Sequence, residues 1–386
     1  MASVDEHEMS GNDPSAPWGQ VRRRLLGAAQ AWYLYPVFVF LLSRLTLLGV
    51  SHLGIAMVMT RPRFDQLERF GPVLVGFCRW DCRFFVQIAE HGYQTADEAA
   101  FFPLLPILAR AVSALGVPLH LALLFVTNLA CLGAFLVIYR IFEQLAGRDA
   151  ARWGLAAYAA YPTGFFLGAV YSESLMVFFT ALAAWLSMHR RHVVAALAVM
   201  LAALSRHVAL AAGVLLLGAQ VQDRPDLRRF LFHPAVLALG LPLLGTGAYM
   251  FWLHLQFGDP WMWYSNRLEY GEMATLSLAQ VVARGFPDVR VSYFMLFACL
   301  PLLGTLSLLR RKEWLPLGMF SAALMAVFLS VGMYALGRFS VACWPAFLPV
   351  GIALARYQVL QLPLIMGLSI FQGLFFFLFS HEFHIL

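Results

Sequence analysis

An aspartate between basic and aromatic residues is the first group in this sequence that could do chemistry. Asp81 follows Arg79 and Trp80, and a carboxylate in that setting could accept a proton from a substrate hydroxyl. A structural alternative stays open, because apolar residues lie three, four and seven positions after Asp81 and predict one face of a short helix. Asp81 would then be the residue that caps this helix.

Two cysteines flank this acid. Cys78 and Cys82 are four residues apart, which is about one helical turn. Because no further Cys or His stands at ligand spacing, the pair alone does not establish a metal site or a disulfide. The other three cysteines fall in apolar segments, as is typical of small core residues: Cys131, Cys299 and Cys343.

A second acid lies between two apolar segments. Glu173 follows Tyr171 in the segment YSES and could orient a substrate or bind a cation. The structural alternative is a carboxylate at the start of a helix, where the helix dipole favours negative charge.

Three basic residues interrupt or border apolar segments: Arg206, His207 and Arg338. Ionisable groups at membrane depth are functional candidates, and such cations can stabilise the charge that develops on a leaving phosphate. Snorkelling to lipid headgroups and pairing with a carboxylate are the structural alternatives. Trp261, in the aromatic segment 257–264, could stack on a sugar face or anchor the chain at a membrane interface.

The composition excludes a soluble globular domain. Hydrophobic residues make up 61% and charged residues 12%, whereas soluble domains carry about 25% charged residues. We predict an all-α polytopic membrane protein, with one bundle at residues 31–386 after a disordered cytoplasmic segment at 1–30. The net charge of +6 comes from scattered arginines rather than one basic patch, which disfavours nucleic acid as a partner.

Hydropathy predicts about eleven membrane-spanning helices. Arginines at 22–24 place the start of the first span in the cytoplasm, because basic loops stay inside. Residues 193–220 carry Arg206 and His207 at their centre and predict a broken hairpin, since a straight helix would hold that charge at mid-membrane. The predicted spans are 32–53, 118–142, 153–170, 174–188, 193–205, 208–220, 234–256, 292–309, 315–334, 339–355 and 362–379.

The candidate residues gather on the outer side of this topology. The first outer loop, 58–117, is predicted to contain amphipathic helices, and the second large outer loop covers 257–291. Turns at 171–174, 206–207 and 337–339 open to the same side. A transporter or lipid flippase without chemistry would also explain the intramembrane arginines, but its polar residues would line a path through the midplane.

Several blocks of the sequence resemble the PIG-V family of mannosyltransferases. The first block is Trp80-Asp81 with IAEHGY at 88–93 and AFFP at 100–103. The second is YP at 161–162 followed by YSESL at 171–175. Shorter blocks are FGDP at 257–260 and GRF at 337–339, so the likeness covers nearly the whole membrane region.

This resemblance implies a GT-C fold and the inverting transfer of a sugar, mannose first of all, from a polyprenyl-phosphate carrier at the extracytoplasmic face. Asp81 matches the acid that the family uses as a base. We expect Arg206, Arg338 and His207 to hold the carrier phosphate. The sugar and acceptor pocket is expected to contain Arg79, Trp80, Tyr171, Glu173 and Trp261.

The acceptor in such a reaction would be a lipid, a glycan or a protein. No metal is required, because arginines can stabilise the leaving group, although a divalent cation between Glu173 and Asp81 is an alternative. The arginine-rich composition favours a bacterial inner-membrane protein.

Overall fold

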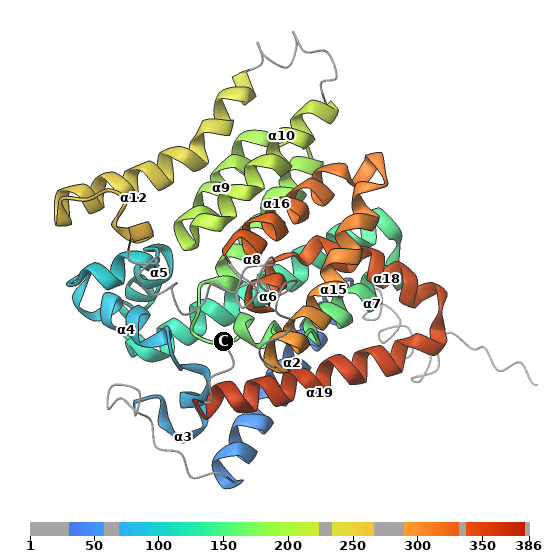
Figure 1. Cartoon of the computed structure of the whole chain (residues 1–386), viewed down its shortest axis with the longest axis horizontal. Coiled ribbons are helices and arrows are strands. Elements are labelled where there is room, and N and C mark those ends of the chain that lie inside the picture. Colours follow the sequence, from blue (N-terminus) through green and yellow to red (C-terminus); the bar gives the residue numbers. More distant parts are fainter. Residues whose placement is uncertain (1–30, 58–68, 224–233, 266–288, 332–336, 383–386) are drawn as a thin grey trace, which may run out of the picture.

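The computed structural model describes residues 31–57, 69–223, 234–265, 289–331 and 337–382, and within these ranges every regular element is a helix (Figure 1). This confirms the predicted all-α class. The predicted disordered segment 1–30 lies outside the described residues, as do residues 58–68 of the first outer loop and 266–288 of the second.

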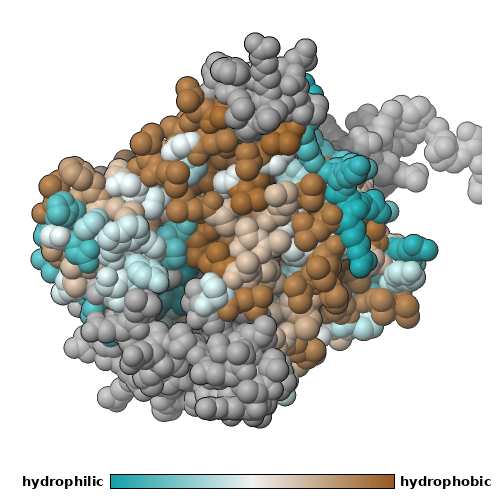
Figure 2. Space-filling model, turned by 45° about the horizontal axis from the view of Figure 1, so that its top comes forward, coloured by the Kyte–Doolittle hydropathy of each residue, from teal (hydrophilic) through white to brown (hydrophobic). Residues whose placement is uncertain are grey.

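Five helices in the described ranges are long and apolar enough to cross a membrane. Each of these apolar stretches contains one α-helix, and several of them also include the 3-10 turn before that helix. They are α2 (Leu34–Met57), α6 (Leu119–Ala146), α12 (Leu241–Phe257), α16 (Leu315–Val331) and α19 (Gln361–Ser380). Hydrophobic side chains cover the middle of the face seen in Figure 2, between hydrophilic residues at its two sides. That belt is the expected surface of a polytopic membrane protein.

Shorter apolar helices complete the bundle: α8 (Glu173–Met188), α9 (His192–Ser205), α10 (Ala212–Asp223) and α15 (Val289–Leu309). The predicted break within 193–220 is confirmed. Helix α9 ends at Ser205, Arg206 has extended backbone, and a 3-10 turn at His207–Ala211 precedes α10. The charged pair therefore lies between two helices rather than inside one.

Two predicted spans are wrong as continuous helices. The span 153–170 is divided between α7 (Arg148–Ala159) and a 3-10 turn at Gly164–Leu167, because Pro162 cannot continue the helix. The span 339–355 begins with two 3-10 turns, around Pro345, before α18 (Phe347–Arg356). Hydropathy alone could not reveal these breaks, since both segments are apolar throughout.

Hydrogen bonds connect the helix break after α7 with the 3-10 turns that precede α18. The Tyr158 hydroxyl donates to the Val341 carbonyl oxygen over 3.0 Å, and Tyr161 pairs with Ser340 over 2.7 Å. The Gln372 amide of α19 donates to the carbonyl oxygens of Ala159 and Tyr161. These buried bonds bring the turn after α7 beside the segment that follows α16, although more than 150 residues separate them in the sequence.

The first outer loop forms a group of short helices at one end of the bundle (Figure 1). Its elements are α3 (Gly71–Leu74), 3-10 turns at Val75–Phe77 and Ala96–Ala100, α4 (Cys82–His91) and α5 (Leu104–Ser113). Helix α4 buries Phe85 and Ile88, two of the three residues of its predicted apolar face, and leaves Phe84 partly exposed. The ring of Phe101 stacks on Phe84 with centroids 4.5 Å apart.

The contact between α7 and α18 gives a test of the packing. A Cβ at Gly351 would lie 2.1 Å from the carbonyl oxygen of Ala150, whereas a Cβ at Gly367 of α19 would have nothing within 4 Å. We expect Gly351→Ala to destabilise the protein by about 1–3 kcal/mol through overpacking. Gly367→Ala should be neutral or stabilise it by up to about 1 kcal/mol. Thermal unfolding of both variants in detergent checks this, and equal stabilities would contradict the close approach.

Candidate active site

A cavity of about 240 Å³ lies where the first outer loop meets the break between α9 and α10. Its wall combines aromatic rings with two carboxylates and three basic groups. The lining residues are Asp81, Phe84, Phe85, Asp97, Ala100, Phe101, Phe102, Ser172, Ser205, Arg206, His207 and Arg338. Four of the residues predicted from the sequence therefore meet at one cavity: Asp81, Arg206, His207 and Arg338.

An ion chain of four side chains lies at this cavity, and three of them line it: Asp81, Arg206 and Arg338. Arg206 Nη1 lies 2.7 Å from Glu173 Oε1, and the same oxygen accepts a hydrogen bond from Arg338 Nε over 3.1 Å. Arg338 Nη2 then donates to Asp81 Oδ2 over 2.9 Å. The order is Arg206, Glu173, Arg338, Asp81, and the four formal charges sum to zero.

The two acids of the chain differ in exposure. The Glu173 side chain is 2% exposed, whereas the Asp81 side chain is 33% exposed and lines the cavity. Glu173 is therefore the internal counterion of the two arginines, and Asp81 is the acid that a bound molecule could reach. The Glu173 Oε2 atom is buried and has no hydrogen-bond partner in the described part of the chain.

Aromatic rings surround the guanidinium groups. Arg338 lies 4.7 Å from the ring centroid of Tyr171 and 5.0 Å from that of Phe339, and Arg206 lies 4.4 Å from Phe339. Burial by itself would lower the pKa of Arg338, but Asp81 and Glu173 outweigh it and hold that pKa above its ordinary value. The guanidinium therefore stays charged at every physiological pH.

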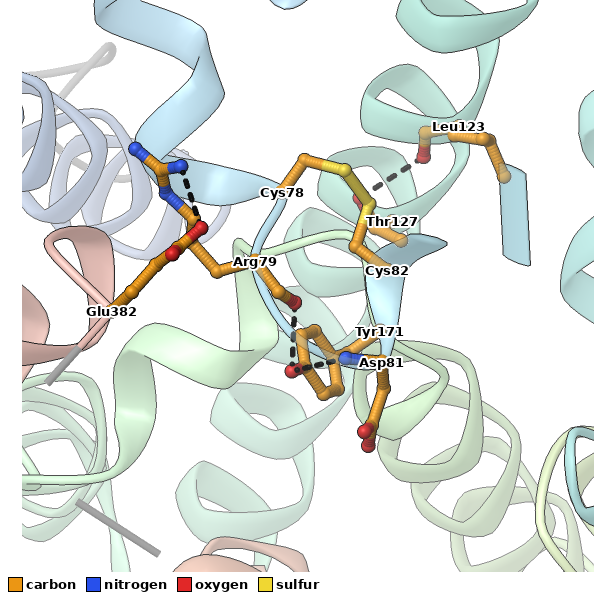
Figure 3. Close-up of a disulfide and its surroundings, with 8 residues drawn as sticks. All are labelled: Cys78, Arg79, Asp81, Cys82, Leu123, Thr127, Tyr171 and Glu382. Atoms are coloured by element: carbon orange, nitrogen blue, oxygen red, sulfur yellow. Dashed lines mark hydrogen bonds and ion pairs between the residues drawn. A yellow bond between two sulfur atoms is a disulfide. The ribbon is translucent and has the colours of Figure 1, made fainter. Parts of the chain in front are cut away.

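Asp81 occupies the position just before α4, but its carboxylate makes no hydrogen bond to the helix start. The capping role that the spacing allowed is therefore wrong. Instead the Tyr171 hydroxyl accepts from the Asp81 backbone N–H over 3.3 Å and donates to the Arg79 carbonyl oxygen over 3.0 Å (Figure 3). The backbone around Asp81 is thus held by Tyr171, while its carboxylate turns to Arg338.

None of the five predicted pocket residues lines the cavity: Tyr171 and Glu173 contact Arg338 beside it, whereas Arg79, Trp80 and Trp261 lie elsewhere. The Arg79 side chain points away from Asp81 and pairs with Glu382 (Figure 3). Trp80 is half-buried against the core beside the first outer loop, and Trp261 is 56% exposed. Their roles in a sugar pocket stay predictions that this arrangement does not support.

Sequence reasoning missed two residues near the cavity. Asp97 lines it from the turn Ala96–Ala100, which a capping box between Thr95 and Glu98 holds in place. The pattern T-A-D-E could have indicated that turn. Trp263, rather than Trp261, approaches the cavity, because its ring lies 4.7 Å from that of His207. These tryptophans are two residues apart, and which of them faces the cavity depends on the loop conformation rather than on composition.

Cys78 and Cys82 form a disulfide on either side of the turn that carries Asp81 (Figure 3). The sequence alone had left this pairing open. In the described ranges no group of three or more His, Cys, Asp or Glu residues could hold a metal ion. The arrangement brings the accessible carboxylate of Asp81, which can accept a proton, together with two fixed guanidiniums, which can bind a phosphate.

Comparison with known proteins confirms the resemblance found in the sequence. Residues 37–223, which include Asp81, Glu173 and Arg206, match the family described as mannosyltransferase (PIG-V). The chain is 28% identical over 178 residues to GPI mannosyltransferase 2 of Schizosaccharomyces pombe, which covers 42% of this chain and 38% of that protein.

Two further relatives carry the same name. GPI mannosyltransferase 2 of Aspergillus fumigatus is 30% identical over 122 residues, or 30% of this chain and 23% of that protein. The Drosophila pseudoobscura pseudoobscura protein is 28% identical over 116 residues, or 27% of this chain and 26% of that protein. Each match spans less than half the length of the relative. Arg338 lies beyond the family match.

The ion chain gives a stability prediction. Glu173→Gln would leave two buried guanidiniums with one carboxylate fewer, and we expect it to cost about 3–5 kcal/mol. Asp81→Asn should cost clearly less, because Asp81 lies at the end of the chain and is partly exposed. Thermal unfolding in detergent separates the two variants, and a larger loss for Asp81→Asn would contradict the assigned order.

The disulfide gives a second prediction. The chain has five cysteines, and Cys131, Cys299 and Cys343 are free thiols. Denatured protein that has not been reduced should therefore take up three alkylating groups per chain, and reduced protein should take up five. Mass spectrometry after alkylation measures this. Five groups without reduction would show that the cysteines beside Asp81 are not bonded.

Proposed function

We propose that this chain, similar over residues 37–223 to the PIG-V mannosyltransferases, transfers a sugar from a polyprenyl-phosphate carrier to an acceptor at the extracytoplasmic membrane face. Mannose is the proposed sugar, and a lipid, a glycan or a protein is the acceptor. The observation that carries the proposal is the direct pairing of Arg338 with Asp81 at the cavity wall. It supports the proposal because a guanidinium that could bind a phosphate lies next to the only reachable acid of the ion chain.

The proposed reaction is one displacement with inversion at the anomeric carbon. The acceptor hydroxyl gives its proton to Asp81 as its oxygen bonds to the anomeric carbon. The bond from that carbon to the phosphate oxygen breaks, and the carrier phosphate leaves with the electron pair. Arg338 and Arg206 stabilise the charge that develops on this leaving group, and no nucleotide is needed.

The pairing of Arg338 with Asp81 suggests how the base is made available. A donor phosphate presents two acceptor oxygens, as a carboxylate does, and the guanidinium of Arg338 could bind either group. Phosphate binding at Arg338 would therefore compete with Asp81 and free its carboxylate for the acceptor hydroxyl. Glu173 keeps the two guanidiniums side by side during this exchange, because its Oε1 atom bonds both.

A groove beside the cavity suits the lipid part of the carrier. It has a volume of about 660 Å³, and apolar residues of α4, α5, α9 and α12 line it almost completely. One aromatic pair separates it from the cavity: Phe102 lines the cavity, Tyr249 lines the groove, and their ring centroids are 4.8 Å apart. An isoprenoid chain in the groove would place its phosphate at the cavity.

The disulfide supports the extracytoplasmic side. Disulfides persist in oxidising compartments and are rare in the cytosol. The bond between Cys78 and Cys82 flanks Asp81 directly, so the cavity would face the oxidising side of the membrane. The opposite end of the bundle carries basic residues such as Arg190, Arg310 and Arg311, as cytoplasmic loops do.

Radiolabel transfer from polyprenyl-phosphate-mannose into membrane lipids and glycans tests the proposal. Asp81→Asn should lower kcat by about 10²–10⁴-fold, because asparagine cannot take up the proton. Arg338→Lys should raise KM for the donor, since lysine cannot make the bidentate hydrogen bonds of a guanidinium to the phosphate. Asp149→Asn, which removes an exposed acid of α7, is the matched control and should transfer at the wild-type rate.

Two outcomes would overturn the assignment. Full activity of Asp81→Asn would remove Asp81 as the base. Failure of the wild-type protein to transfer any of several donor sugars, combined with movement of the labelled lipid between leaflets, would favour a flippase, which the apolar groove could also serve.

A further inference from the structure

The turn before α4 is held on two opposite sides. On one side the Tyr171 hydroxyl bonds the Arg79 carbonyl oxygen and the Asp81 N–H. Trp80, between these two residues, has a φ of 54°, in the left-handed region that a bulky residue rarely adopts. Such a conformation persists only where the surroundings impose it. The disulfide closes the same turn from Cys78 to Cys82.

On the other side the turn is bound to the far end of the chain. Arg79 Nη1 lies 3.2 Å from Glu382 Oε1, just beyond the end of α19, and the two side chains are 2% and 15% exposed (Figure 3). The Nε atom of Arg79 is buried and finds no hydrogen-bond partner in the described chain. Glu382 is therefore the one carboxylate in the described chain that neutralises this buried guanidinium.

The end of α19 is itself fixed against α2. A Cβ at Gly54 would lie 2.2 Å from Cε1 of His381, so the imidazole packs directly on the α2 backbone. The His381 Nδ1 atom is within 2.8 Å of the Phe377 carbonyl oxygen. Glu382 thus reaches Arg79 from a rigid support rather than from a loose end.

We propose that the Arg79–Glu382 ion pair is a positioning pair, which sets the direction of the Asp81 carboxylate through the two peptide bonds between Arg79 and Asp81. This inference rests on the proposed function, because it assigns the pair an effect on the transfer step. Arg79 does not touch the cavity, and its earlier assignment to the sugar pocket is replaced by this role.

Neither the Tyr171 hydrogen bonds nor the disulfide alone fixes the turn completely. Tyr171 holds the backbone through two hydrogen bonds on one side, and the disulfide fixes only the ends of the turn. Arg79 pulls the backbone toward α19 while Tyr171 holds its carbonyl on the side of the ion chain. Without the ion pair, the backbone at Trp80 could leave its left-handed conformation, and this change would move Asp81 away from Arg338.

A charge exchange between the partners tests the pair. Purified full-length protein is prepared as wild type, Arg79→Glu, Glu382→Arg and the double exchange, and transfer from polyprenyl-phosphate-mannose is measured at varied donor concentration. Each single variant should lower kcat at least tenfold while KM for the donor changes less than twofold. The double exchange should recover most of that loss. Because a smaller folded fraction would also lower the apparent kcat at an unchanged KM, kcat is expressed per folded molecule, with the folded fraction of each variant measured by thermal unfolding.

Two further variants keep the test decisive. Glu382→Gln retains shape and an acceptor oxygen, and should lower kcat per folded molecule severalfold even if the charge variants fail to fold. Glu143→Gln is the control, since Glu143 pairs with Arg140 and Arg148 about 24 Å along α6 from Thr127, which lies beside the disulfide (Figure 3). It should leave kcat unchanged.

The outcomes separate this inference from the proposed function. If the wild-type protein transfers sugar and Glu382→Gln and both single exchanges keep its kcat, the positioning pair is wrong and the transferase stands. A double exchange that folds but stays as slow as the single variants would also overturn the pair. If the wild-type protein transfers no sugar from any donor, the proposed function fails and the pair has no reaction to position.

Discussion

Two guanidinium groups buried beside the cavity need negative charge, and the arrangement around them follows from that need. Arg206 and Arg338 share one oxygen of Glu173, which is 2% exposed, and Asp81 completes the neutralisation from the cavity wall. An unpaired charge at this depth would be expensive, so all four side chains must be held together. The ion chain therefore constrains the fold at this place. Its arginines are also the proposed phosphate-binding groups, and Asp81 is the proposed proton acceptor.

The fold meets this constraint with segments that end at the cavity. Glu173 begins α8, Arg206 follows the last residue of α9, and Asp81 precedes α4. Arg338 lies just before the 3-10 turn Ser340–Ala342, and the hydroxyls of Tyr158 and Tyr161 bond to this turn. Helix ends supply short polar segments at membrane depth, where a continuous helix would direct charge to lipid. The breaks in the apolar spans are thus the places where the site is built.

The sequence indicates the members of the ion chain because charge is rare in it. With 12% charged residues, an Arg or Glu beside an apolar segment stands out, and Asp81, Glu173, Arg206 and Arg338 were all found this way. The pairing of Arg79 with Glu382 could not be found, since 303 residues separate them and no periodicity links them. The same holds for the choice of Trp263 over Trp261 and for the helix breaks at 160–163 and 343–346. These depend on tertiary hydrogen bonds and loop geometry rather than on local pattern.

A structure with a bound donor gives the most direct measurement of the proposed site. The ligand would be a phosphonate analogue of polyprenyl-phosphate-mannose, which binds but cannot release its sugar, and electron cryo-microscopy would locate it. We expect the phosphonate oxygens within hydrogen-bonding distance of Arg338 and Arg206, the anomeric carbon facing Asp81, and the lipid chain in the groove beside Tyr249. A ligand bound with its phosphonate away from both arginines, or on the opposite side of the membrane from Asp81, would contradict the proposal.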